Sequence, residues 1–187
     1  SISQLWDSVA GGGRSSADII AIGAMAGLII SILDRTGLGQ ALTLLLASVG
    51  EDSIILLLLL TAVVSILLGM GMPTSAIYLL LATMIAPSLV KLGIHPISAH
   101  MFVLYFGLMS MITPPVAIAA FAAATLSGAK PMATGVTAVR LGWIAYVVPF
   151  VFVLSPALLW QGSTFAIATG AITAFVGVWL GSCGLIG

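Results

Sequence analysis

The chain has 187 residues, of which 61% are hydrophobic and only 5% are charged, and its mean hydropathy is +1.30. Because a soluble domain carries about 25% charged residues, this composition excludes a soluble fold and predicts an all-α integral membrane protein. The formal net charge of zero gives no indication of a nucleic-acid partner, and the single cysteine, Cys183, excludes an internal disulfide.

The first fifty residues predict one membrane span between two segments that do not cross. Residues 1–16 are polar and glycine-rich without an initiator methionine, so we expect a cytoplasmic loop in a piece of a longer polypeptide. Residues 17–35 have the length and apolar content of a transmembrane helix. Residues 37–50 are apolar but too short to cross, which predicts an interfacial helix or an arm that braces two parts of the protein.

Residues 53–92 form two apolar arms that are interrupted at 69–75 by Gly-Met-Gly-Met-Pro-Thr-Ser. The pattern predicts a helical hairpin with its tip at the interruption. The two arms either re-enter the membrane from one side or each cross it completely. Both topologies place the ends of the hairpin on the same side, so the sequence leaves the two open.

The remaining apolar segments predict three further spans. Residues 97–128 are longer than one bilayer thickness at a rise of about 1.5 Å per residue, and Ser-Met-Ile-Thr-Pro-Pro breaks them at 110–115. This segment is expected to be a discontinuous transmembrane helix. Residues 136–160 and 163–182 are predicted to be transmembrane helices, the first with Trp143 and Tyr146 near one end and Trp160 at the other.

The few loop charges give the predicted orientation. The positive-inside rule places Arg14, Lys130 and Arg140 in the cytoplasm and leaves Glu51, Asp52 and Lys91 outside.

The two interruptions predict a transport site. Lipid offers no hydrogen-bond partner to a freed peptide group, so broken backbone at membrane depth must lie inside protein or beside a hydrated cavity. Paired breaks of this kind point to the ion and solute site of a secondary transporter. The predicted substrate and ion site comprises Gly69, Gly71, Pro73, Thr74, Ser75, Ser110, Thr113, Pro114 and Pro115.

Sodium is favoured over protons as the coupling ion. All charged residues fall in loops or at segment ends, whereas proton-coupled carriers usually keep an acid or a histidine inside the membrane. His100 would be such a group only if it lay deeper than its neighbours suggest. Sodium needs only neutral oxygens, here the hydroxyls of Thr74, Ser75, Ser110 and Thr113 together with carbonyls that Gly69 and Gly71 allow to turn inward.

The helix that starts after the first break predicts an anion site. Pro73 and Pro114 suit first-turn positions, and Thr113 is placed to cap its helix. Met72, at the corresponding place before Pro73, has no acceptor oxygen. The following backbone amides therefore remain available to a carboxylate substrate at the positive helix end.

Other interpretations of the same residues remain. Gly, Pro, Ser and Thr also occur as kinks and packing residues in ordinary membrane helices, which would suit a non-transporting packing or anchoring subunit. Met70 and Met72 at one break, with Met109 and Met111 at the other, could bind Cu(I). His95 and His100 have no carboxylate partner for a metal site. No nucleophile and base lie together, so an enzyme is not expected.

The chain resembles the large membrane subunit of tripartite ATP-independent periplasmic (TRAP) transporters, and most closely the fused type that works with a TAXI-class receptor. The resemblance covers about residues 14–160. It rests on Leu68-Gly-Met-Gly-Met-Pro-Thr-Ser-Ala76, Ala86-Pro87, Leu92-Gly-Ile-His-Pro96, Tyr105-Phe-Gly107, Ser110-Met-Ile-Thr-Pro-Pro-Val116, Pro131-Met-Ala-Thr-Gly135, Val148-Pro-Phe150 and Ser155-Pro-Ala157.

The resemblance implies a sodium-driven importer with an elevator-type motion, built from two inverted repeats in a bacterial or archaeal cytoplasmic membrane. This chain would be the C-terminal half, supplying the second repeat with hairpin 53–92 and the broken helix. The implied partners are the upstream half of the permease, a small membrane subunit that can be fused to it, and a periplasmic solute-binding protein. Where Met111 stands, some relatives carry a polar side chain. No cofactor is implied besides Na⁺, and the organic anion is not identified.

Overall fold

The computed structural model describes residues 2–38, 40–41, 44–46, 48 and 53–186, and every regular element in these ranges is helical. The expected all-α class is therefore confirmed. Three helical stretches in the described ranges are long and apolar enough to cross a membrane, namely Thr74–Lys91, Pro131–Leu154 and Thr164–Gly184.

The N-terminal helix α1 runs without interruption over Ile2–Thr36 and thus includes both the expected loop at 1–16 and the expected span at 17–35. Residues 2–16 contain no proline, and added β-carbons at Gly11, Gly12 and Gly13 would meet no atom within 4 Å. Each glycine costs about 1 kcal/mol relative to alanine, which does not stop a helix that propagates cooperatively. The arm expected at 37–50 falls largely outside the described residues.

The hairpin consists of α3 (Ile54–Gly69), α4 (Thr74–Met84) and the short α5 (Ala86–Lys91). Helix α3 begins where the Leu56 N–H donates a hydrogen bond to the Ser53 hydroxyl, at 3.4 Å, and it ends at the first break. Leu81 and Ile85 are fully buried and belong to the apolar core that the hairpin forms with the next helix.

Helix α6 (Pro96–Met109) lies at the centre of this core and contacts α3, α4, α5 and α9 (Ile144–Leu154). Phe102 and Phe106 pack edge-on against Phe150 of α9, with ring centroids 5.3 and 5.5 Å apart. An added β-carbon at Gly107 would lie 2.5 Å from Ile77 and 2.8 Å from Leu81, so glycine allows the close approach of α4 and α6. Beyond the second break, α7 covers Ile118–Ser127.

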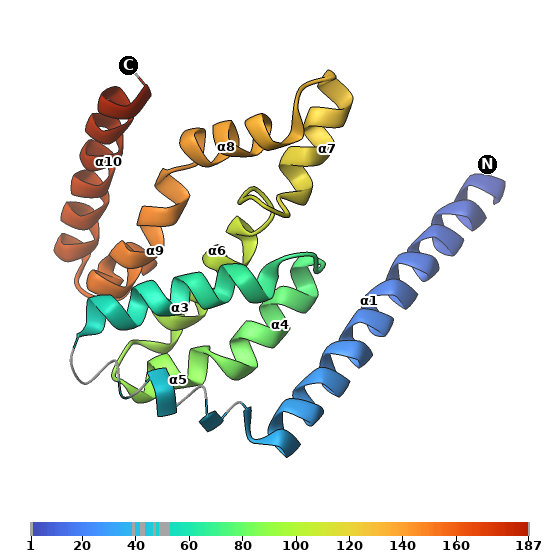
Figure 1. Cartoon of the computed structure of the whole chain (residues 1–187), viewed down its shortest axis with the longest axis horizontal. Coiled ribbons are helices and arrows are strands. Elements are labelled where there is room, and N and C mark those ends of the chain that lie inside the picture. The colour runs from blue at the N-terminus through green and yellow to red at the C-terminus, as the bar shows by residue number, and fades with distance from the viewer. Residues whose placement is uncertain (1, 39, 42–43, 47, 49–52, 187) are drawn as a thin grey trace.

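The C-terminal part contains α8 (Pro131–Leu141), α9, the 3₁₀ helix η1 (Pro156–Leu159) and α10 (Thr164–Ile186). The span expected at 136–160 is thus divided between α8, α9 and η1. Pro156 disfavours helical backbone at Ser155, where α9 ends. Figure 1 shows α10 and α1 at opposite edges of the molecule, with the hairpin and α6 between them.

Candidate functional site

The first break is a sharp turn between α3 and α4. Gly69 is the last residue of α3, Met70 is extended with ψ of 123°, and Gly71 has φ of +81°. Only glycine adopts positive φ without steric cost, and Pro73 disfavours helical backbone at Met72. The sequence of this segment therefore forces the chain out of the helix.

The start of α4 leaves backbone donors without a side-chain cap. Its N-cap is Pro73, which has no hydrogen-bonding side chain, and Thr74 and Ser75 follow as exposed residues of the first turn. The first N–H groups of a helix have no intrahelical acceptor, and they lie at the positive end of the helix dipole. This terminus is therefore chemically suited to a carboxylate.

The second break is held together by turn-type hydrogen bonds. Met111 and Ile112 donate to carbonyls three residues earlier, at 3.0 and 3.1 Å. Pro114 and Pro115 have no N–H, so the carbonyls four residues before them lose their helical donors. The Ala119 N–H donates to one of these, the Met111 carbonyl, at 2.9 Å across the break.

Both predicted hydroxyl groups of the second break already make hydrogen bonds. The buried Ser110 hydroxyl donates to the Gly107 carbonyl at 2.6 Å. The Thr113 hydroxyl donates to the Met109 carbonyl at 2.5 Å and lies 2.6 Å from the Tyr146 phenol. Since a threonine hydroxyl carries one hydrogen, the phenol is the donor in the second contact. Both hydroxyl oxygens keep a lone pair with which to bind a cation.

The two breaks touch at Gly69. An added β-carbon there would lie 2.8 Å from the Gly107 carbonyl oxygen and 2.9 Å from the Ser110 hydroxyl. The exposed Thr74 and Ser75 lie on the other side of the hairpin turn from Gly69, and no described hydrogen bond joins them to the second break. The structure therefore brings Gly69 and Ser110 together, and no hydrogen bond among the described residues links the Thr74 or Ser75 hydroxyl to the second break.

Pro114 and Pro115 have different surroundings. An added β-carbon at Gly135 of α8 would be 3.0 Å from Pro114, whereas Pro115 is exposed. Pro114 therefore packs against α8, and Pro115 faces outward.

Three polar groups near the breaks, those of Tyr146, Thr61 and Ser65, were not among the site residues expected from the sequence. Tyr146 was expected only as an aromatic residue near a helix end, although a buried tyrosine hydroxyl usually has a partner. Thr61 and Ser65 are fully buried on α3, eight and four residues before Gly69 respectively, and their hydroxyls have no described hydrogen-bond partner. His100 is partly buried, and its Nδ1 atom lies 3.2 Å from the Tyr78 hydroxyl oxygen.

The site contains only neutral groups. Residues 69–75 and 110–115 include no charged side chain, and Lys91, Lys130 and Arg140 are exposed at the ends of helices. Among the residues that the structure describes, no three His, Cys, Asp or Glu side chains lie close enough to hold a metal ion. The oxygens at the breaks are therefore hydroxyls and carbonyls, which are ligands that suit a monovalent cation.

The fold and this pair of breaks define an all-helical membrane protein whose helices are interrupted at two places that touch at Gly69. A family model described as "Tripartite ATP-independent periplasmic transporter, DctM component" matches residues 1–167. The chain therefore belongs to the DctM family and is part of the large membrane component of a TRAP transporter. No curated protein and no solved structure matches the chain.

Proposed function

We propose that the chain is a segment of a secondary active permease that imports organic anions of the carboxylate class together with Na⁺. The observation that carries this proposal is the contact of Gly69 with Ser110, which joins two interruptions of membrane helices at one place. Membership of a family of secondary transporters supports the same function.

The proposed cation site uses neutral oxygen atoms at the two breaks. The candidates are the hydroxyls of Thr74, Ser75, Ser110 and Thr113, with carbonyls near Gly69, Gly71, Pro114 and Pro115. The carbonyl of Ser110 supports this proposal because Pro114 cannot supply the donor that a continuous helix would provide. The uncapped N-terminus of α4 is the proposed site of the substrate carboxylate.

The proposed assembly contains more than this chain. The hairpin at 53–92 and the broken helix at 97–128 would form the second of two inverted repeats, and a preceding half of the permease would supply the first. The small membrane subunit, fused or separate, and a periplasmic binding protein that delivers the substrate would complete the transporter in the cytoplasmic membrane. Within it, the hairpin would be re-entrant and would move as part of an elevator.

Sodium-dependent uptake by the complete transporter tests the ligand assignment. Thr113→Ala and Thr74→Ala are each expected to lower sodium affinity severalfold, because each removes one oxygen ligand. Thr83→Ala is the matched control, since the Thr83 hydroxyl lies on the same helix as Thr74 but donates to Leu79 and Leu80 carbonyls. Unchanged sodium dependence in both test variants would overturn the assignment.

A packing or anchoring role is the alternative, and one observation favours it at Thr113. The Thr113 hydroxyl is hydrogen-bonded to the Met109 carbonyl at the end of α6 and to the Tyr146 phenol of α9. It therefore links two helices, which is what a residue with only a structural role would do. Under this alternative, Thr113→Ala lowers the thermal stability of the transporter without changing its response to sodium. The two measurements on one variant therefore distinguish the two functions.

A further inference from the structure

Two hydroxyls in the interior of the protein are left without hydrogen bonds. The buried polar side chains among the described residues are those of Thr61, Ser65, Ser88, Ser98 and Ser110. Ser98 and Ser110 donate to backbone carbonyls at 2.8 and 2.6 Å, and Ser88 also has an interaction partner. The hydroxyls of Thr61 and Ser65 on α3 have none among the described residues. Both have therefore lost their contacts with water without replacement, which costs free energy.

Neither hydroxyl uses the partner that its own helix offers. A threonine or serine inside a helix can donate to a carbonyl of the preceding turn, and Thr83, Thr125 and Thr137 do so at 2.8, 3.0 and 2.9 Å. Thr61 and Ser65 make no such bond. Their hydroxyls therefore remain available to a molecule that reaches this side of α3.

Thr61, Ser65 and Gly69 lie on one side of α3. They are four residues apart, so each is about 6 Å further along the helix than the one before and about 40° around it. Helix α3 packs on α6, and Figure 1 shows it lying across that helix. Gly69, the last residue of the series, touches the second break at Ser110. The two hydroxyls therefore form a row along α3 that leads to the place where the two breaks meet.

Apolar contacts hold α3 in place. Among the residues that the structure describes, side-chain hydrogen bonds join α4 to α6 through Tyr78 and α6 to α9 through Ser98, but none joins α3 to another helix. Leu57 and Leu58, each 1% exposed, pack in the core and close the row toward the start of α3. Apolar contacts have no preferred direction, so α3 can move away from α6 without breaking a hydrogen bond. The two hydroxyls gain water when it does.

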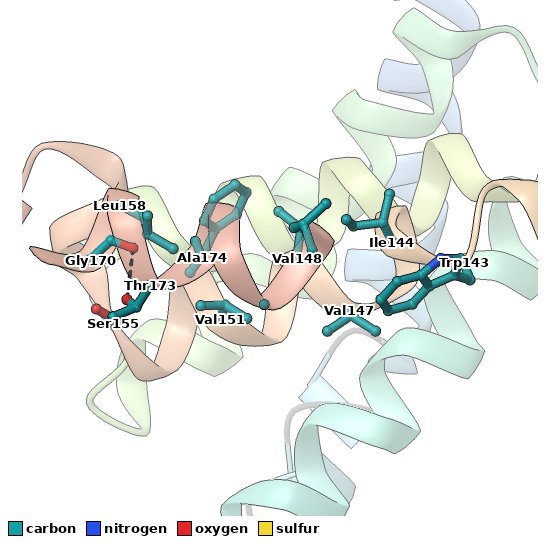
Figure 2. A pocket seen from close by; sticks show the side chains of 13 residues that line it. Trp143, Ile144, Val147, Val148, Val151, Ser155, Leu158, Gly170, Thr173 and Ala174 are labelled. Atoms are coloured by element: carbon teal, nitrogen blue, oxygen red, sulfur yellow. Dashed lines mark hydrogen bonds between the residues drawn. The ribbon is translucent and has the colours of Figure 1, made fainter. Parts of the chain in front are cut away.

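The hollow between α9 and α10 shows no comparable polar feature. Figure 2 shows Val147, Val148 and Val151 along it, and the Thr173 hydroxyl at one end already donates to the Gly170 carbonyl at 3.0 Å. In the described part of the chain, the buried hydroxyls without partners are both on α3. The contact of α3 with α6 is therefore the place where a change of state would hydrate polar groups.

We propose that α3 separates from α6 in a second state of the transporter, in which Thr61 and Ser65 face water and line a path to the two breaks. Their hydroxyl oxygens can replace part of the hydration shell of a small cation on this path. Use of the path by Na⁺ rests on the proposed function, whereas the opening itself does not. In an elevator motion alone, the hairpin and α6 would move as one body, and their contact would stay dry.

Reaction of an introduced cysteine with a charged reagent tests the opening. The complete transporter is used in proteoliposomes, with Cys183 and any other reactive cysteine replaced by serine. The probe is 2-(trimethylammonium)ethyl methanethiosulfonate, a cation that reacts with thiols in water and does not enter dry protein, and it is added on both sides. Ser65→Cys is expected to react about tenfold faster than Ser98→Cys, because openings of this kind are local. Ser98→Cys is the matched control, since Ser98 is equally buried but is hydrogen-bonded to α9.

Equal rates in the two variants would overturn the proposal. Two slow reactions would mean that the contact stays closed, and two fast ones that the whole fold loosens. A water molecule or an ion that stays bound to the two hydroxyls would likewise leave Ser65→Cys unreactive. Thermal unfolding shows whether each variant is folded. If Ser65→Cys does not fold, Thr61→Cys is the second variant, with the same expected result.

Thr61→Val tests whether the path serves transport. Valine is similar in shape but has no hydroxyl, so it favours the closed contact and is expected to slow uptake severalfold. The equilibrium affinity for sodium stays unchanged, in contrast to the loss expected for Thr113→Ala. Thr83→Val is the control and leaves the rate of uptake unchanged, because the Thr83 hydroxyl is bonded within its own helix.

The two proposals fail in different ways. An unchanged rate of uptake in Thr61→Val would overturn the path as a route to the breaks. If uptake proves independent of sodium while Ser65→Cys still reacts faster than its control, the proposed sodium coupling fails and the opening of α3 stands.

Discussion

The phenol of Tyr146 donates a hydrogen bond to the Thr113 hydroxyl across 2.6 Å and so joins the second helix break to α9. Helix α9 also receives a hydrogen bond from α6, where the Ser98 hydroxyl donates to the Phe152 carbonyl at 2.8 Å. The aromatic contacts of Phe150 lie between these two bonds in the sequence. The conformation of the break therefore depends on a helix about thirty residues later in the chain.

Tyr146→Phe is expected to lower the free energy of unfolding by about 1 kcal/mol, the net value of one hydrogen bond. The same variant is expected to weaken sodium dependence if Thr113 is a ligand, because Tyr146 holds its hydroxyl in place. Thermal unfolding and uptake assays measure the two effects. Tyr105→Phe is the control, since Tyr105 packs its ring on Phe152 and its hydroxyl makes no described hydrogen bond. Equal losses of stability in both variants would contradict the role of the phenol.

Gly69→Ala is expected to destabilise the protein by about 1–3 kcal/mol, the usual cost of overpacking. The added methyl group would meet the backbone carbonyl of Gly107 at 2.8 Å, and backbone cannot move aside as a flexible side chain can. Gly23→Ala on α1 is the control, because its methyl group meets nothing and alanine favours a helix. A Gly69→Ala variant as stable as the parent would show that the two breaks are further apart than described.

Gly71→Ala is expected to cost about 1–2 kcal/mol because the positive φ of +81° is strained for any residue with a β-carbon. An added β-carbon at Gly71 meets no atom within 4 Å, so the cost comes from the backbone and not from a clash. Gly71→Asn should be less harmful because asparagine tolerates this conformation better. Similar unfolding temperatures for the two variants would argue against a left-handed turn.

Thr61→Val is expected to stabilise the protein by about 1 kcal/mol or more, because burial of a hydroxyl without a hydrogen bond costs about 1–3 kcal/mol. Ser65→Ala should act in the same direction, since its hydroxyl is also buried without a described partner. Thr83→Val is the control, because that hydroxyl is hydrogen-bonded within its own helix. Loss of stability on Thr61→Val would indicate that a bound molecule or a further chain satisfies the hydroxyl.

The breaks could be predicted from the sequence because their causes are local. Gly71 allows positive φ at its own position, and Pro73 disfavours helical backbone at the residue before it. The pair Pro114-Pro115 lacks two backbone N–H donors whatever the tertiary structure around it. Proline at the start of a helix gives a similarly local signal, and it begins α6 at Pro96 and α8 at Pro131.

The parts that could not be predicted depend on contacts between distant residues. Nothing local in the sequence pairs Tyr146 with Thr113, or places Ser110 against Gly69. The polar composition of residues 1–16 indicated a loop, but composition alone does not end a helix that has no proline and that continues from an apolar half.

The hydrogen bond from Ala119 to Met111 has a mechanical consequence. It closes the loop of the second break so that the base of α7 is fastened directly to the end of α6. We therefore expect a displacement of α7 to change the conformation of residues 110–113 directly.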